Sequence, residues 1–365
     1  MTSEKPLSEP HPSGEALPHR RRPRYAGKNP RHFAEKYKEH DPARYAETVA
    51  KVVASGKTPA GTHRPIMVQE VLSVLVPRPG EVAVDCTLGY GGHAEAILPR
   101  LLPGGRLLGL DADPFELPKT ELRLRRLGFG PEQLWVQRSN FAGLPKALLQ
   151  AGLEGVDLVL ADLGVSSMQL DDPTRGFSLK HEGPLDMRMN PTRGQPASLL
   201  LERIRSDALA KLLLENADEP EAEKIATACA GHRFATTRAL ADTVLAALAS
   251  GNPESRQLSV RRVFQALRIA VNDEFSALET FLRNLPAVLR PGGRVAILTF
   301  HSGEDRRVKK AFAVGVRDEL YAEAAREVAR PTAEECRANS RAAPAKLRWA
   351  RRACSGASNG LVVES

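Results

Sequence analysis

The pattern of apolar and polar positions changes near residue 63. Residues 1–60 are polar and interrupted by proline and glycine, with helical spacing only around residues 41–56. From residue 63 onward, short apolar runs of strand length alternate with stretches in which apolar residues recur at helical spacing. We therefore expect residues 1–60 to form an extension outside the main fold.

Four apolar runs have the length and composition of buried strands, and helical patterns separate them. The runs lie at residues 81–87, 104–113, 133–140 and 156–164. A helical pattern at residues 67–75 precedes the first run, and another at 93–102 follows it. Strands that alternate with helices predict an α/β fold, in which a parallel sheet carries helices on both faces.

The alternation stops between residues 171 and 260. A polar stretch and several helical patterns fill this interval, which holds no run of comparable strand quality. One long helical pattern over residues 261–289 then leads to a further strand pattern at 292–302. We expect a main domain of residues 61–170 and 261–352, an inserted helical subdomain of residues 171–260, and a tail of residues 353–365.

Composition narrows the class of protein without identifying it. The 365 residues, 42% of them hydrophobic, suffice for one large domain or two ordinary ones. No apolar run reaches the roughly 18–20 residues that cross a bilayer, and the N-terminus lacks the apolar stretch of a secretory signal. We therefore expect a cytoplasmic protein without a membrane partner. The cysteines form no CxxC pair, which indicates neither a disulfide framework nor a metal site: they are Cys86, Cys229, Cys336 and Cys354.

The positive charge is concentrated near the N-terminus. The chain has a formal net charge of +8, and residues 20–38 carry eight arginines and lysines against the single acid Glu35. Tyr25, Phe33 and Tyr37 are interleaved with these charges, which suits phosphate contact combined with base stacking. A solvated tail is the alternative, and the composition alone leaves both interpretations open.

A cluster of glycines lies between the first predicted strand and the helix after it. Gly89, Gly91 and Gly92 would let the backbone approach a ligand closely, at the strand ends where ligands bind in doubly wound folds. Asp111 ends the second strand 22 residues after Gly89, where a ribose-binding acid belongs. The third glycine is too close to the second for the dinucleotide fingerprint. These residues leave NAD, S-adenosylmethionine and a purely structural turn open.

The fourth predicted strand ends in Asp162, beside the glycine turn in this topology. An acid at this place can accept a hydrogen bond from an amino group and take up charge as the amine reacts. This favours amine-directed group transfer over a dehydrogenase. Ser166, Ser167 and Gln169 follow, and they could simply cap the next turn.

The residues from Asp162 onward also carry a family resemblance. The run DLGVSSMQLDDPTRGFSLKHEGPLDMRM at 162–189 resembles the signature of the MraW/RsmH family, the bacterial 16S ribosomal RNA (cytosine-N4-)-methyltransferases. The similarity continues, in order, over residues 63–72, 85–98, 264–279, 292–312 and 345–352. It implies a class I S-adenosylmethionine-dependent methyltransferase, with a Rossmann-like doubly wound sheet and an inserted helical subdomain.

The resemblance also implies roles for individual residues. S-adenosylmethionine would be bound by the residues that match the family's cofactor set, namely Gly91, Gly92, His93, Asp111, Phe141, Asp162 and Gln169. The implied reaction is methylation of the exocyclic N4 amine of a cytidine in the decoding region of 16S rRNA, within the small ribosomal subunit. Asp162 is the candidate catalytic residue, although cofactor binding alone is the alternative.

The target base must leave its stack to reach such a pocket. Candidates for the RNA side are Arg175, Phe177, Asp186, Arg188, Arg268, Asn272 and His301, each with an ordered ion pair or a packed ring as its alternative. The chain departs from the family pattern at Tyr90 in the glycine turn, at residues 216–222, at residues 339–348 and at Gly303, where leucine is usual. The proton acceptor for the amine stays unassigned. The oligomeric state is also open, with a homodimer as one alternative.

Overall fold

The structure is a computed structural model that describes residues 65–179 and 181–354. The expected N-terminal extension and nearly all of the expected tail lie outside the described residues. Within the described ranges, none of the helices combines the length and the apolar character needed to cross a bilayer.

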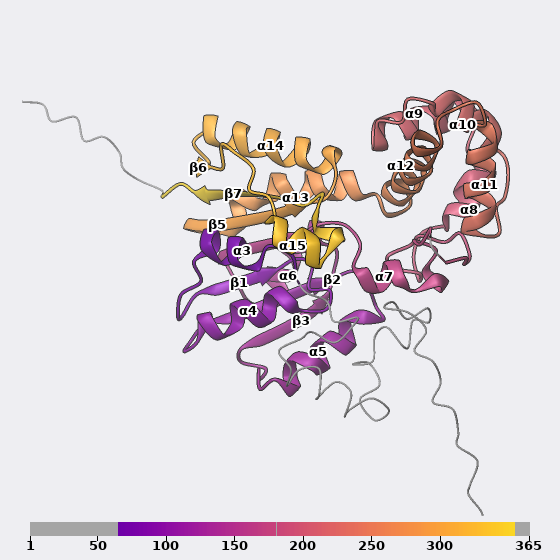
Figure 1. Ribbon diagram of the computed structural model, residues 1–365. Helices are drawn as coiled ribbons and strands as arrows, with labels where there is room; N and C mark the ends of the chain where they lie inside the picture. The colour runs from indigo at the N-terminus through magenta and orange to yellow at the C-terminus, as the bar shows by residue number, and fades with distance from the viewer. Residues whose placement is uncertain (1–64, 180, 355–365) are drawn as a thin grey trace, which may run out of the picture. The chain divides into compact units, whose positions relative to one another are not determined.

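A seven-stranded sheet, in the order β3-β2-β1-β4-β5-β7-β6, organises the fold (Figure 1). Five strands are parallel: β1 (Val82–Asp85), β2 (Arg106–Asp111), β3 (Leu134–Arg138), β4 (Val156–Asp162) and β5 (Leu289–Thr299). Each corresponds to one of the strand patterns in the sequence. Two further strands, β7 (Lys346–Arg352) and β6 (Tyr321–Ala324), add an antiparallel edge that the sequence did not predict.

Helices cover both faces of the sheet. One hydrophobic cluster joins the strands to α6 (Leu144–Gln150), α13 (Glu274–Val288) and α14 (Ser302–Arg317). The cluster on the opposite face joins them to α3 (Val68–Leu75), α4 (Gly92–Leu101) and α5 (Glu116–Arg126). Successive strand residues alternate between the two, because side chains of a strand point to opposite faces: Leu158 and Leu160 pack on one side, Val159 and Ala161 on the other. Burial on both faces explains why the central strands β1, β2 and β4 are mostly apolar.

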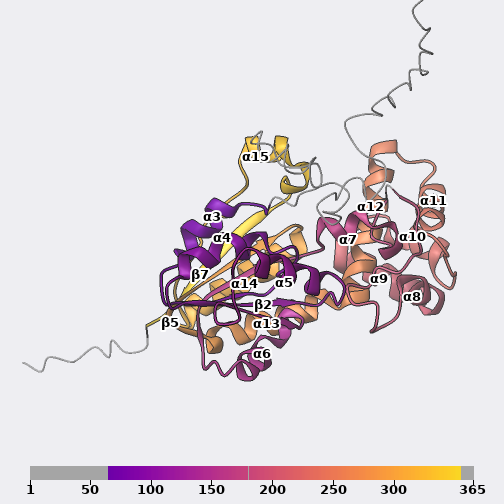
Figure 2. The ribbon, with the colours of Figure 1, turned by 90° about the horizontal axis from the view of Figure 1, so that it is seen from below.

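Six α-helices lie between β4 and α13 in the described chain. They are α7 (Ser167–Asp171), α8 (Ala197–Arg203), α9 (Ser206–Ala217), α10 (Ala222–Cys229), α11 (Thr237–Ala247) and α12 (Pro253–Asn272). Helices α8 to α12 lie side by side in Figures 1 and 2 and enclose a hydrophobic cluster of their own. The boundary expected at residue 260 falls inside α12, whose residues Val260 to Leu267 contribute to that cluster. The limits of a subdomain here stay a prediction.

The prediction of a single long helix over residues 261–289 is wrong. The structure has two helices, with α12 ending at Asn272 and α13 beginning at Glu274. Asp273 between them has φ 51° and ψ 41°, in the left-handed region that aspartate tolerates better than most residues. The apolar spacing continues across this residue, so periodicity alone could not show the break.

Candidate active site

A cavity of about 410 Å³ opens at the carboxyl ends of the parallel strands. Its volume lies in the range of small-molecule sites, and strand ends are where ligands bind in this kind of sheet. All seven residues expected to hold the cofactor line it: Gly91, Gly92, His93, Asp111, Phe141, Asp162 and Gln169. They come from the ends of β1 to β4 and the segments that follow.

The glycine turn after β1 needs its glycines. Gly91 has φ 83°, and a Cβ there would lie 2.9 Å from the side chain of Thr120. A Cβ on Gly92 would lie 2.9 Å from the ring of Pro65. The backbone N–H of Gly89 donates to Asp111 Oδ2 at 2.7 Å, which ties the turn to the end of β2. The turn is therefore fixed directly beside the expected ribose-binding acid.

Tyr90, the departure within this turn, packs against α5. The guanidinium of Arg123 lies 4.1 Å from the centre of the Tyr90 ring, an arrangement that favours a cation–π interaction. Arg123 also donates to the Tyr90 carbonyl from Nε (3.1 Å) and Nη2 (2.8 Å). Tyr90 thus has a structural partner that helps to hold the turn.

Asp111 keeps acceptor capacity for a ligand. It accepts backbone N–H groups from Gly89 and Asp113, and an ionised carboxylate offers about four lone-pair sites. Burial raises the pKa of Asp111 to about 6, although these hydrogen bonds oppose the shift. An acid with this environment at the cavity wall suits ribose hydroxyls.

Gln169 and Arg175 both bind the buried acid Asp113. Gln169 Nε2 donates to Asp113 Oδ2 at 2.9 Å, and Arg175 Nη1 donates to the same atom at 2.8 Å. Burial by itself would raise the pKa of Asp113, but these two donors outweigh it and hold the pKa below its usual value. Gln169 also forms a reciprocal capping box with Ser166 at the start of α7. The capping role considered from the sequence is therefore present, and Gln169 lines the cavity as well.

Asp162 is the acid with an unused acceptor in the cavity. Its backbone N–H donates to Thr87 Oγ1 at 2.6 Å, which ties the ends of β4 and β1 together. Among the described residues, none hydrogen-bonds to its buried Oδ1. Burial, and after it the negative charge of Glu304, raise the pKa of Asp162 to about 7. A small change in charge nearby therefore decides whether Asp162 is ionised at neutral pH.

His93 faces Asp162 from the start of α4. Its Nε2 lies 3.0 Å from the carbonyl oxygen of Ile66, which makes Nε2 the protonated nitrogen of a neutral ring. Nδ1, at 3.8 Å from Asp162 Oδ2, is then unprotonated. Burial lowers the pKa of His93, which favours this neutral form.

The residues expected on the RNA side do not gather in one place. Arg268 and Asn272 line the cavity, whereas the other five are not among its lining residues. Arg268 donates to both oxygens of Glu274, at 2.8 Å each. Asn272 accepts from Met189 N–H (2.7 Å) and donates to the Met187 carbonyl (2.8 Å), so it anchors the loop before α8.

The remaining RNA-side candidates have structural partners. Arg175 is buried against Asp113 and donates to two backbone carbonyls. Phe177 belongs to the hydrophobic cluster of the inserted helices. Asp186 and Arg188 form an ion pair at 2.7 Å. In the structure these four side chains form ion pairs or pack in the core, as the alternative interpretation expected. Their contact with RNA stays a prediction.

Glu304 lines the cavity and was missed in the sequence. It is 3% exposed, accepts the backbone N–H of Phe300 at Oε2 (2.8 Å), and has His301 Nε2 3.2 Å from Oε1. One feature of the sequence could have identified Glu304 as a site residue: it lies three residues after His301, in the first turn of the helix that follows β5. The nearby departure Gly303 also has a reason: a Cβ there would lie 2.6 Å from Phe275 Cζ.

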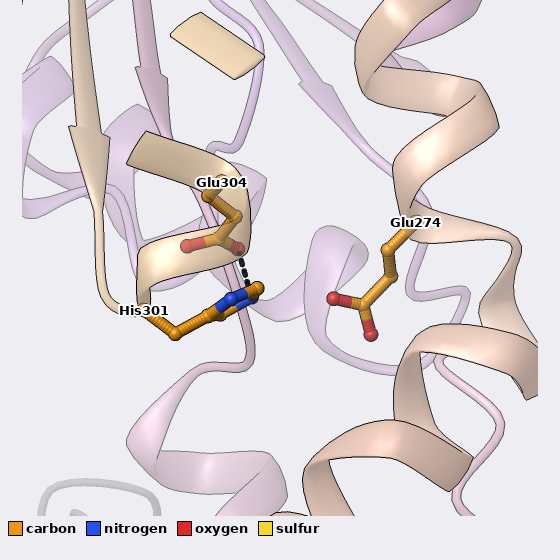
Figure 3. A group of neighbouring side chains, drawn as sticks. All are labelled: Glu274, His301 and Glu304. Carbon is orange, nitrogen blue, oxygen red and sulfur yellow. Dashed lines mark ion pairs between the residues drawn. The ribbon is translucent and has the colours of Figure 1, made fainter. Parts of the chain in front are cut away.

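Glu274, His301 and Glu304 have the spacing of metal ligands (Figure 3). One ligand atom from each lies within 4.8 Å of the others. Figure 3 shows the imidazole of His301 against Glu304, with Glu274 facing the pair from α13. Arg268, however, binds both oxygens of Glu274 and supplies the positive charge that a cation would bring. We therefore assign no metal to this group.

The strand order and the position of the cavity define a class I methyltransferase fold. Residues 60–353 match the model of the MraW methylase family. The chain is 49% identical over 342 residues to Ribosomal RNA small subunit methyltransferase H 1 of Lachnoclostridium phytofermentans, covering 91% of this chain and 93% of the relative. The corresponding H 2 protein of Alkaliphilus metalliredigens is 50% identical over 339 residues, with 90% and 97% covered.

The chain belongs to the MraW methylase family and is an S-adenosylmethionine-dependent methyltransferase. The resemblance found in the sequence, the fold class and the cofactor are thereby confirmed. Among solved structures, NSun6 from Pyrococcus horikoshii aligns at 12% identity with a TM-score of 0.40, over 80% of this chain and 53% of its own.

The residues of the cavity fit S-adenosylmethionine. The glycine turn permits close approach, Asp111 can accept from ribose hydroxyls, and Asp162 offers a buried acceptor to a positively charged group. When bound, the cofactor supplies an activated methyl group on a positively charged sulfur. Which side chains touch it stays a prediction.

The raised pKa of Asp162 makes cofactor binding depend on pH. Below pH 7 the free protein carries Asp162 mainly protonated, and the positive sulfur of the cofactor favours the carboxylate. We expect the Kd for S-adenosylmethionine to fall as pH rises from 6 to 8, with proton release on binding at the lower pH. Calorimetry in buffers of different ionisation enthalpy measures both.

S-adenosylhomocysteine is the matched control for this pH effect, because its sulfur is neutral. Its affinity should change less over the same pH range, and Asp162→Asn should remove the difference between the two ligands. An equal pH dependence for both ligands in the unmodified protein would assign the titration to another group, such as Asp111, whose pKa is about 6.

Proposed function

We propose that the protein methylates the exocyclic N4 amine of a cytidine in the decoding region of 16S rRNA, with the small ribosomal subunit as its partner. The relatives named ribosomal RNA small subunit methyltransferase H support an RNA substrate, because they align over nearly their whole length. The observation that carries the choice of an amine is Asp162, a partly buried acid at the end of β4 whose buried Oδ1 has no hydrogen-bond partner among the described residues. Such an acceptor suits an N–H donor.

The protein has to align the amine with the methyl group, because the methyl group of the cofactor is already activated. The lone pair of a cytosine amine is delocalised into the ring, so the nitrogen must be turned and held in line with the methyl group. Positioning of this kind can contribute several kcal/mol, roughly 7–11 in well-oriented intramolecular reactions. A base bound in the cavity would also exclude water from the reacting atoms.

Asp162 has two roles in this proposal. Its Oδ1 accepts an N–H of the amine, which favours a pyramidal nitrogen with its lone pair directed toward the methyl carbon. On accepting a methyl group the amine nitrogen would carry a positive charge and would have to lose one proton. A carboxylate whose pKa is near 7 can take that proton and later return it to solvent.

The basic run at residues 20–38 lies outside the described residues, and its contact with RNA stays a prediction. The cytoplasmic location and the oligomeric state, including the homodimer alternative, also stay predictions from the sequence.

The test is transfer of a labelled methyl group to small ribosomal subunits that lack the modification, compared with naked 16S rRNA. Digestion to nucleosides and mass spectrometry should identify N4-methylcytidine at one position. Subunits that already carry the mark serve as the control and should take up no label. A label on ribose, on another base, or on no nucleoside would contradict the proposal.

A further inference from the structure

The cavity continues beyond the residues expected to hold the cofactor. Its additional lining comes from α12 and α13 (Arg268, Asn272, Glu274) and from the segment after β5 (Phe300, Glu304). None of these five belongs to the cofactor set that the family resemblance implied. The cavity therefore has polar groups that the cofactor assignment does not use.

We propose that Glu304 and Phe300 form the subsite for the target base, in which Glu304 accepts an N–H of the amine and Phe300 lies against the ring. This proposal rests on the proposed function and names residues that act on the same substrate. His301, which contacts Glu304 and not the cavity, is a positioning residue.

Glu304 has the properties of a fixed acceptor. Its two oxygens each engage one neighbour within the described chain, Phe300 N–H and His301, so lone pairs remain on both. It lies in the first turn of α14, where the helix dipole favours a negative charge. Burial would raise its pKa, but His301 and Arg268 outweigh this and keep the pKa below its usual value.

The neighbouring acid Glu274 has its charge neutralised by a close partner. Both of its oxygens receive N–H groups from Arg268 in a two-pronged ion pair, which is the strong geometry for such pairs. Arg268 and Glu274 thus neutralise each other at the cavity wall. Glu304 has no such pair with an arginine among the described residues, so it is the stronger acceptor for a further donor.

Glu304 and Asp162 both line the cavity. The negative charge of Glu304 also contributes to the raised pKa of Asp162. A cytosine amine has two N–H groups. One acceptor for each would fix the orientation of the nitrogen more firmly than one acceptor alone.

Phe300 supplies an aromatic surface beside these acids. The segment after Asp162 has no aromatic residue that could stack on a base. The Phe300 ring lies next to that segment, since its Cδ2 would be 3.9 Å from a Cβ on Gly164. Base–aromatic stacking contributes roughly 1–3 kcal/mol per base, so Phe300 can hold an unstacked base in the cavity.

The experiment compares Glu304→Gln with the unmodified protein on unmodified small subunits. Glutamine keeps the size but presents an amide, which loses the charged hydrogen bond. We expect kcat to fall about 100-fold, the upper range for a hydrogen bond to a charged group, with the Kd for S-adenosylmethionine changed less than about twofold. Glu304→Asp should recover part of the rate. Glu279→Gln, an exposed acid on α13, is the control and should behave as the unmodified protein.

A second variant separates binding from folding. Phe300→Leu keeps an apolar side chain but removes the ring, and we expect a KM about tenfold higher, from the loss of stacking, at unchanged cofactor affinity. If Glu304→Gln failed to bind the cofactor, Phe300→Leu would decide the proposal. Normal kcat and KM in both variants would overturn the proposal. If Glu304→Gln cannot bind the cofactor, a normal KM in Phe300→Leu would overturn it. N4-methylcytidine made by the unmodified protein would still uphold the proposed function, so the two failures are distinguishable.

Discussion

Asp162→Asn should lower the rate of methyl transfer by about 100-fold or more, the usual range for loss of an acid–base group. Asparagine has the same size and keeps an acceptor oxygen, so the fold and the bond between the Asp162 backbone and Thr87 should persist. What it loses is the negative charge and the ability to take the amine proton. Single-turnover transfer at saturating cofactor measures the effect on the chemical step.

Asp157→Asn is the matched control, because Asp157 lies on the same strand and is not among the residues that line the cavity. It should leave the single-turnover rate within about twofold, since Asp157 binds the Val82 N–H and Arg290 rather than a ligand. If Asp162→Asn retained the full rate with normal cofactor affinity, Asp162 would have neither of the roles assigned to it.

Asp113→Ala should lower the free energy of unfolding by about 3–5 kcal/mol, the typical cost of removing one partner of a buried ion pair. The variant would leave the guanidinium of Arg175 buried without its carboxylate and would free Gln169 at the cavity wall. The folded state holds the pKa of Asp113 below its ordinary value. Ionised Asp113 therefore stabilises the fold fully at pH values above its ordinary pKa, and this stabilisation is lost as the pH falls through the lower pKa of the folded state. Urea denaturation at pH 7 measures the change.

The control for this second variant is Asp207→Ala. Asp207 pairs with Arg205 on the surface, where the side chains are 69% and 83% exposed. Exposed pairs of this kind contribute little to stability, so Asp207→Ala should leave the free energy of unfolding nearly unchanged. A loss in Asp113→Ala as small as in Asp207→Ala would mean that water replaces the missing carboxylate and that the pair does not stabilise the fold.

The sequence predicted the parts of the fold that are buried on both sides. The central strands β1, β2 and β4 and the second half of β5 are mostly apolar, so their pattern is clear, whereas the outer strand β3 is only partly buried. Strand β7 alternates charged and apolar residues and β6 is short and half polar, which left both unpredicted. The break at Asp273 was missed because it depends on one backbone conformation and not on a change in periodicity.

The candidate site divides in a similar way. The cofactor residues follow strand ends, and parallel strand ends meet at one edge of a sheet, so topology alone brings them together. The RNA-side candidates were chosen by their similarity to family motifs. Such a similarity does not show whether a side chain points into the cavity or into the core. Arg175 and Phe177 point into buried contacts, whereas Glu304 reaches the cavity because a helix begins directly after β5.

The hydrophobic cluster of α8 to α12 shares no buried residue with the two clusters on the sheet. Substitutions within it can therefore be compensated locally, without displacing the turn that carries Gly91 or the end of β4. Residues 216–222, from the end of α9 to the start of α10, differ from the usual family text while all seven cofactor candidates line the cavity. Within this stretch, Asp218 binds Ser302 and Arg306 of α14, so the apolar packing of the inserted helices can vary separately from the sheet while this polar contact links the two.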